Sequence, residues 1–165
     1  MPEYQWALGN GEIISADYNR TEDSLSSTQV LAALQSAFQQ FGHIVHCAPV
    51  SELLPEVYTV SFEDASERSI TICAKGTTPG GRSNLNDEQR TQQKSKYIQY
   101  AHSKLLAGES AVQLGVYSRD GQTIFCAWAL KSSTAAADTT ISKQIKIATI
   151  AQAMKEGFAQ QEKGL

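Results

Sequence analysis

Residues 76–94, GTTPGGRSNLNDEQRTQQK, form the stretch around which the rest of the chain is organised. Three glycines and Pro79 open it, which is typical of a loop, and glycine lets the backbone that carries Arg82 come close to a ligand. The polar residues that follow predict the start of a helix, with Asn86 or Asp87 as its cap. Cationic and amide side chains would then converge on one surface, which suits an anion or the edges of bases. A solvated connector accounts for the same composition, and both interpretations stay open.

Charge is unevenly distributed along the chain, which has 165 residues and a formal net charge of −3. Residues 1–74 contain two basic and ten acidic side chains, a net of −8, whereas residues 75–165 contain twelve basic and seven acidic side chains, a net of +5. The length fits one domain, which we expect to span residues 1–165. Because phosphate attraction depends on the local field, the basic half predicts a nucleic-acid partner, with chance clustering as the competing explanation.

The N-terminal sequence MPEYQWALGNGEII lacks the basic and then apolar pattern of a signal peptide. No apolar run approaches the roughly 20 residues of a membrane helix, so we expect a cytoplasmic protein without a membrane partner. The three cysteines, Cys47, Cys73 and Cys126, are widely spaced among apolar neighbours. This pattern predicts buried free thiols.

Motifs for catalysis and metal binding are not found in the sequence. A restriction-type nuclease core needs acidic residues before its lysine, and the strands that lead to Lys75 and Lys131 supply none. His43 and His46 lie beside Cys47 without a second group of ligands. We therefore predict a binding module and not an enzyme, with no catalytic residue, no metal and no cofactor.

Apolar spacing predicts the elements that precede the glycine-rich stretch. They are a hairpin over residues 4–14, a helix over 24–41 that Gly42 ends, strands over 43–50, 57–62 and 69–74, and a turn or short helical piece at 53–55.

The second half predicts a helix over residues 90–106, strands over 110–117 and 123–130, and a final helix over 142–159. Asp120-Gly121 is a strong hairpin signal between the two strands. The expected fold is α+β, a largely antiparallel β-sheet flanked by helices in a single domain.

Several segments of the C-terminal half follow one another in a recognisable order. They are residues 82–93, the hairpin LGVYSRDGQTIFCAWAL, Ser142-Lys143-Gln144, and a closing helix that ends in GFA. This order resembles the sulfur-binding domain of modification-dependent (type IV) restriction enzymes. The resemblance implies a domain that binds DNA in which sulfur replaces one non-bridging phosphate oxygen. It also implies an apolar recess for the sulfur beside basic residues.

Candidate site residues follow from this resemblance. Sulfur is larger and less strongly hydrated than oxygen, so an apolar recess penalises it less. The family's recess includes a proline and an aromatic residue, which the 131–138 loop lacks and which Pro79 or Tyr117 could replace. The predicted sulfur recess consists of Pro79, Gly81, Ala135, Ala136 and Ala137. The predicted DNA contacts are Arg82, Ser83, Arg90, Gln93, Lys94, Lys131, Ser132, Ser133, Lys143 and Gln144.

The expected partner is double-stranded, phosphorothioated DNA. Members of the resembling family usually carry an HNH nuclease, and no such motif occurs here. The chain is therefore expected to be either an excised recognition module, with a nuclease domain or subunit elsewhere, or a standalone reader. Two other classes stay open: a reader of methylated or unmodified DNA, and a protein-interaction domain that uses residues 24–41 or the final helix.

Overall fold

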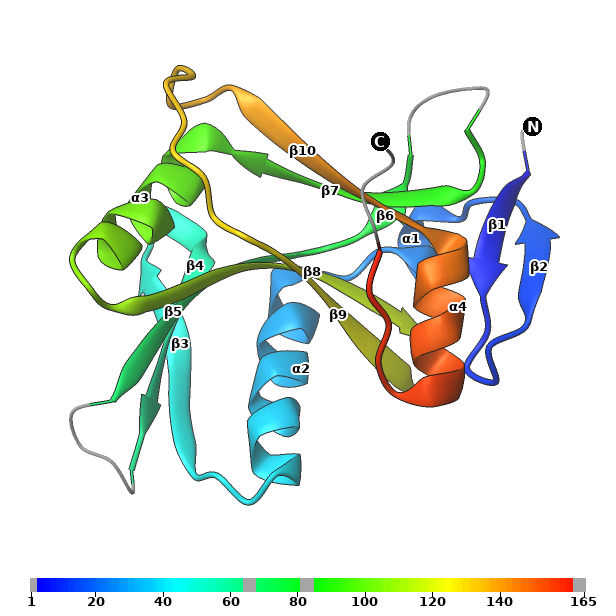
Figure 1. The fold of residues 1–165 in the computed structure, drawn as a ribbon, viewed down its shortest axis with the longest axis horizontal. Coiled ribbons are helices and arrows are strands. Elements are labelled where there is room, and N and C mark those ends of the chain that lie inside the picture. Colours follow the sequence, from blue (N-terminus) through cyan, green and yellow to red (C-terminus); the bar gives the residue numbers. More distant parts are fainter. Residues whose placement is uncertain (1–2, 64–67, 81–84, 162–165) are drawn as a thin grey trace.

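The computed structural model describes residues 3–63, 68–80 and 85–161, and its architecture is α+β (Figure 1). The predicted fold class is confirmed, although the strands divide among three sheets. Among the described strands of the largest sheet, β5 and β8 pair in parallel and the other neighbours are antiparallel. This five-stranded sheet consists, in spatial order, of β3 (Val45–Ser51), β4 (Leu54–Phe62), β5 (Ser69–Gly76), β8 (Ser110–Arg119) and β9 (Gln122–Trp128).

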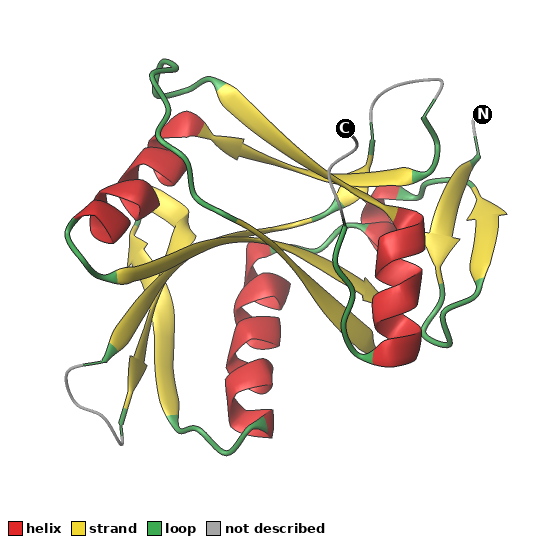
Figure 2. Ribbon diagram, viewed as in Figure 1, coloured by secondary structure: helices red, strands yellow, loops and turns green. Residues whose placement is uncertain are grey.

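Alternation along β4 and β5 gives the large sheet two apolar faces. Tyr58 and Ile72 lie opposite each other, and so do their neighbours Val57 and Cys73. Because successive side chains of a strand point to opposite faces, the two pairs belong to different cores. The helices that cover these faces, on opposite sides of the sheet in Figure 2, are α2 (Ser27–Gln40) and α3 (Ser95–Leu106).

Helix α2 confirms the helix predicted over residues 24–41, with a start three residues later. Ser26 accepts a hydrogen bond from the Gln29 backbone, and the Gln29 side chain accepts one from the Ser26 backbone, which forms a capping box. Phe41 is the C-cap, and Gly42 has a positive φ of 80°. This left-handed residue ends the helix as expected.

Two predicted helical starts are wrong. Residues 88–94 form strand β7 (Glu88–Lys94), and residues 140–146 form strand β10 (Thr140–Lys146), which pairs with it. Along β7 the residues Gln89, Thr91 and Gln93 are buried and alternate with more exposed ones. This period of two belongs to a strand, but polar residues carry it, so hydrophobic spacing does not reveal it.

The turn predicted at residues 53–55 is present but lies slightly earlier, at Glu52 and Leu53, because β4 begins at Leu54. Strands β3 and β4 are joined by a tight connection, and the register shifts between Pro49 and Ser51. Strand β3 lies at the edge of the large sheet, where a proline costs no ladder hydrogen bond.

A three-stranded sheet crosses the large one (Figure 1). Gly115 of β8 marks the crossing, since a Cβ built there would lie 2.6 Å from Cγ2 of Thr91 and 3.0 Å from Cγ2 of Thr77. The absence of a side chain at Gly115 therefore lets the two sheets approach closely. The smaller sheet has the order β10, β7 and β6 (Thr78–Pro79).

The N-terminal hairpin packs against the end of β8. The Tyr117 hydroxyl accepts a hydrogen bond from the Ala7 backbone N–H at 2.9 Å and donates one to the Ala7 carbonyl at 2.7 Å. The hairpin is the predicted one, and short helix α1 follows it. The elements of this end are β1 (Tyr4–Ala7), β2 (Ile13–Ala16), α1 (Arg20–Asp23) and α4 (Ile147–Glu156).

The prediction of buried free thiols is confirmed, since Cys47, Cys73 and Cys126 are all buried and unpaired. Within the described ranges, none of the helices combines the length and the apolar character that a bilayer crossing requires.

Candidate functional site

The structure gathers part of the predicted DNA-binding set on the outer face of the small sheet. Arg90 lies opposite Thr78 of β6 on one side and Gln144 of β10 on the other. Gln92 lies opposite Ser142, one step further along the same face. Directly opposed residues of antiparallel strands point the same way, so these side chains form one polar face.

A basic hollow of about 420 Å³ lies where this face meets α1. We define it by the side chains of Arg20, Lys75 and Arg90 together with Tyr4, Tyr18 and Pro79. No carboxylate occurs among the described residues that line it. Such a lining of cations and apolar surface suits an anion.

The cations of the basic hollow differ in how they are paired. Lys75 Nζ donates to the Gln92 carbonyl at 2.9 Å and lies 3.8 Å from the Glu56 carboxylate. Burial raises the pKa of Glu56, and Lys75 acts against that shift. Arg90 Nε is buried and has no hydrogen-bond partner among the described residues. Arg90 therefore brings a cationic side chain to the wall of the basic hollow, although its Nε is itself covered by protein.

Other predicted contacts lie away from the basic hollow. The Gln93 side chain is buried and accepts a hydrogen bond from Gln113. Its amide therefore lies in the interior of the protein and is not available to a ligand at the surface. Lys143 lies opposite Thr91 and is half-buried, on the face of β10 turned away from Gln144. Lys94 is exposed at the far end of β7 and lies 3.7 Å from Asp138.

The loop over residues 131–138 covers the start of α3. The Lys96 backbone N–H donates to the Ala137 carbonyl at 3.0 Å, and Ser95 and Ser133 share a hydrogen bond between their hydroxyls. Ala136 and Ala137 are exposed and Ala135 is half-buried, so these alanines are not core residues. The other predicted contacts of this loop, Lys131 and Ser132, are exposed.

The predicted sulfur recess is not brought together in one place. Pro79 lies opposite Gln89 near the start of β7. The 131–138 loop, which contains the three alanines, follows β9 and adjoins the other end of β7, at Lys94. At roughly 3.3 Å per strand residue, about 16 Å of strand separates the two groups. Gly81, Arg82 and Ser83, which complete the predicted site, lie outside the described residues.

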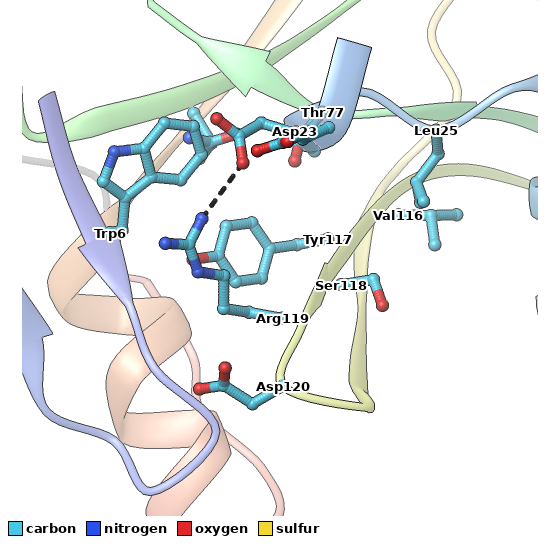
Figure 3. A pocket seen from close by; sticks show the side chains of 11 residues that line it. Trp6, Asp23, Leu25, Thr77, Val116, Tyr117, Ser118, Arg119 and Asp120 are labelled. Atoms are coloured by element: carbon cyan, nitrogen blue, oxygen red, sulfur yellow. Dashed lines mark hydrogen bonds and ion pairs between the residues drawn. The ribbon is translucent and has the colours of Figure 1, made fainter. Parts of the chain in front are cut away.

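A second cavity, which no sequence motif indicates, lies between the N-terminal hairpin and the β8–β9 turn (Figure 3). We call it the Arg119 cavity. Arg119 points across it and donates to Asp23 at 3.2 Å, while its guanidinium lies 5.0 Å from the centre of the Trp6 ring. Asp120, at the turn, accepts from the Gly9 backbone N–H at 2.9 Å.

Two buried polar residues, Gln89 of β7 and Thr77 between β5 and β6, complete the Arg119 cavity. Gln89 and Thr77 line it, and their side-chain polar atoms have no hydrogen-bond partner among the described residues. Burial also raises the pKa of Tyr117, another lining residue, to about 12. The only sequence signal at this site was Asp120-Gly121, which predicted a turn and no cavity.

Fold and site define an α+β domain with an anion-suited face on its smaller sheet. The family model described as Methylase-associated X1 matches residues 68–165, and the chain belongs to this family. The family's description associates it with methylases, the enzymes of modification systems. The matched region contains Lys75, Pro79 and Arg90 of the basic hollow. No curated protein and no solved structure matches the chain.

Proposed function

We propose that this protein is a DNA-recognition module of a methylase-associated system. The basic hollow and the adjoining outer face of β7 and β10 would bind the backbone of double-stranded DNA. The observation that carries this proposal is the basic hollow itself, in which Arg20, Lys75 and Arg90 line one recess with no carboxylate among its described lining residues. Phosphate is the anion that such a cluster recognises best in a modification system.

The geometry of the small sheet supports contacts beyond a single phosphate. Gln144 and Ser142 continue the polar face from Arg90 and Gln92, with Lys94 at its end. Hydroxyl and amide side chains commonly donate to phosphate and sugar oxygens and so fix the register of a protein on a duplex. The face would therefore position the protein on DNA.

The finer proposal is that the DNA carries a phosphorothioate group and that the basic hollow holds its sulfur. Tyr4, Tyr18 and Pro79 provide apolar surface beside Arg20 and Arg90. A phosphate oxygen buried against this surface would lose hydration without compensation, and sulfur would lose less. The resembling family lines its sulfur recess with a proline and an aromatic side chain. In this protein Pro79 and the two tyrosines of the basic hollow would take these places, and not the 131–138 loop.

We further propose that the module recognises DNA without chemical catalysis of its own, so modification or cleavage belongs to a partner protein. The test is a binding titration at fixed salt with one duplex in plain form and with a single phosphorothioate of each configuration at phosphorus. The proposal expects tighter binding of one sulfur-containing duplex. Equal binding of all three would leave a reader of unmodified DNA, and no binding would overturn the function.

Arg90→Ala is the matching variant. A charge-assisted hydrogen bond contributes roughly 1.5–3 kcal/mol, so the affinity for DNA should fall about ten-fold or more. Lys104→Ala is the control, because Lys104 lies in the last turn of α3 and does not line the basic hollow. Equal losses in the two variants would indicate nonspecific charge attraction.

A further inference from the structure

Strand β9 is an open edge of the large sheet. It pairs with β8 on one side and with no other described strand. The other edge strands of the two larger sheets carry features that discourage strand pairing: β3 contains Pro49 and a register shift, β6 is very short, and β10 carries Lys143 and Lys146. Between Gln122 and Trp128, β9 contains no charged residue and no proline. Its edge is therefore suited to receive another strand.

The register of the β8–β9 hairpin determines which backbone groups of β9 face outward. The residues that flank the two-residue Asp120-Gly121 turn exchange hydrogen bonds, and along the hairpin hydrogen-bonded and non-hydrogen-bonded pairs then alternate. The pair of Val116 and Phe125 is therefore a non-hydrogen-bonded one. The Val116 carbonyl agrees with this register, since it accepts from the Thr77 N–H at 2.9 Å on the side of β5. The N–H and C=O of Phe125 therefore point away from β8.

The outward backbone groups of β9 are unpaired and within reach of a ligand. Ala127 lies two residues beyond Phe125, so its N–H and C=O have the same orientation. Neither residue makes an outward backbone hydrogen bond to any part of the chain that the structure describes. Ala127 is exposed and Phe125 is half-buried. An extended peptide beside β9 would supply partners for these groups, as in recognition by strand addition.

A groove of about 510 Å³ runs along this edge. One wall consists of β9 from Ile124 to Trp128, and the other is formed by α4 together with residues 158–161, which return beside the helix (Figure 1). Three residues of a strand occupy roughly 480 Å³ at a rise of 3.3 Å, a strand spacing of 4.8 Å and a sheet spacing of 10 Å. The groove therefore has room for a peptide segment opposite Phe125, Cys126 and Ala127.

The described lining of this groove carries no charge. Its apolar part includes Ile145, Ile150 and Ala153, and the aromatic side chain of Phe158 is 74% exposed at the rim. A peptide residue opposite Cys126 points to the same face as Cys126, which packs in one core cluster with Ile150. A charged side chain there would lose its hydration without compensation, so the lining selects an uncharged, apolar one.

We propose that this groove binds an extended segment of a partner protein, which adds to β9 as an antiparallel strand and places an uncharged, apolar side chain opposite Cys126. The proposed function leaves modification or cleavage to a partner protein, and the groove would hold that partner. Only this choice of partner rests on the proposed function. Gln144 lines the groove and also belongs to the polar face beside Arg90, so the partner would lie next to the DNA.

Binding is tested with the full chain and the capped peptide acetyl-Ser-Thr-Val-Thr-Ser-amide. In an NMR titration the backbone N–H resonances of Phe125 and Ala127 should shift. Methylation of both threonine nitrogens removes the N–H groups that face β9 and should weaken binding by about ten-fold or more. Methylation of the valine nitrogen, which faces away from β9, should leave the affinity unchanged. Equal effects of the two methylated peptides, or no shift along β9, would overturn the proposal.

Two substitutions at one position link the effect to the open edge. Ala127→Pro removes an outward N–H that makes no hydrogen bond to β8, so the variant should fold and bind the peptide about ten-fold more weakly or worse. Ala127→Val keeps the N–H and suits a strand, so it should bind like wild type. Undiminished binding by Ala127→Pro would refute the site. If Ala127→Pro fails to fold, the methylated peptides decide the question on the wild-type protein.

Sedimentation equilibrium separates a second copy of this chain from a foreign segment. The proposal expects a monomer at the concentrations that bind the peptide. A dimer that Ala127→Pro dissociates would show that β9 pairs with β9 of another copy and would overturn the proposal.

Arg90→Ala separates this inference from the proposed function, because it should weaken duplex binding and leave peptide binding unchanged. Ala127→Pro should have the opposite effects. A wild-type protein that binds the duplex and not the peptide would overturn this inference alone. One that binds the peptide and not the duplex would overturn only the DNA-recognition proposal.

Discussion

The side-chain amides of Gln93 and Gln113 meet inside the protein, where Nε2 of Gln113 donates to Oε1 of Gln93 across 2.9 Å. Each residue is 1% exposed. Gln93 belongs to β7 and Gln113 to β8, so this hydrogen bond connects the sheet that carries the basic hollow to the large sheet. Because both amides are buried, few other hydrogen-bond partners are within their reach. This hydrogen bond therefore restrains the position of the small sheet relative to the large sheet.

A double-mutant cycle should show coupling between the two amides. Gln113→Leu leaves the Gln93 oxygen buried without a donor, so the free energy of unfolding should fall by roughly 1–3 kcal/mol. Gln93→Leu combined with Gln113→Leu should cost less than the sum of the single changes. Urea denaturation measures all three. Gln39→Leu, at an exposed position of α2, is the control and should change stability by less than about 0.5 kcal/mol. Strict additivity would contradict the coupling.

Gly115→Ala should destabilise the crossing of the sheets. The added Cβ would lie 2.6 Å from Cγ2 of Thr91, closer than atoms tolerate, and overpacking of this kind typically costs about 1–3 kcal/mol. Thermal melting checks the loss. Thr91→Ser removes the opposing methyl group, so the double variant should recover part of the stability. Gly80→Ala, where the nearest atom is the Glu88 Cβ at 3.4 Å, should have a smaller effect.

Stability should fall at alkaline pH. Burial raises the pKa of Cys73, Cys126 and Tyr117 to about 12 in the folded protein. In the unfolded chain a thiol titrates near 9 and a phenol near 10, so the unfolded state loses these protons first. Unfolding is thus favoured as pH rises from 9, by about 1.4 kcal/mol per pH unit for each group between its two pKa values.

Urea midpoints at pH 8, 9.5 and 10.5 measure this decline under reducing conditions. Cys126→Ala should weaken the pH dependence above pH 9, because one titrating thiol is then missing. Tyr117→Phe should weaken it only above pH 10 and should also lower stability at pH 8, since it removes both hydrogen bonds to Ala7. A midpoint that stays constant from pH 8 to 10.5 would contradict the raised pKa values.

DNA affinity should decrease as salt increases, because bound phosphates release counterions. The logarithmic slope reports the number of phosphates contacted. Arg90→Ala should reduce its magnitude by about 1 if Arg90 contacts a phosphate, whereas Lys104→Ala should leave it unchanged. Titrations at several salt concentrations measure both slopes. A salt-independent interaction would favour a protein partner instead.

Ala136→Asp tests where sulfur selectivity arises. Ala136 is exposed and contributes its carbonyl to Thr139, so the substitution should preserve the fold. Since the 131–138 loop lies apart from Pro79, we expect a similar loss of affinity for the plain and the sulfur-containing duplex. A selective loss for the sulfur-containing duplex would move the sulfur recess from the basic hollow to this loop.

The sequence predicted correctly those turns and helices whose formation depends on residues close together in the chain. Asp120 and Gly121 have positive φ values of 54° and 74°, as the Asp-Gly signal indicated for a tight hairpin. The helix over residues 24–41 was visible because its buried positions are apolar. Strand β7 was missed because its buried positions are Gln89, Thr91 and Gln93, and only the sheet packed against them reveals that they are interior.

The same reason limits what the sequence indicates about the candidate site. Arg90 was predicted because it follows the glycine-rich stretch. Arg20 and Lys75 were not, since they reach the basic hollow from α1 and β5 and share no local motif with Arg90. The Arg119 cavity depends on contacts between residues more than one hundred positions apart, such as Gly9 with Asp120.

The central position of β5 in the large sheet affects how the protein can be shortened. The family match begins at residue 68, immediately before β5, so a fragment cut there would lose β3, β4 and α2. Strand β5 would then become an open edge with the sequence SITICA, whose N–H and C=O groups were paired with β4. Unprotected apolar edges recruit strands from other molecules. The isolated family region should therefore self-associate, which the intact chain prevents by pairing β4 with β5.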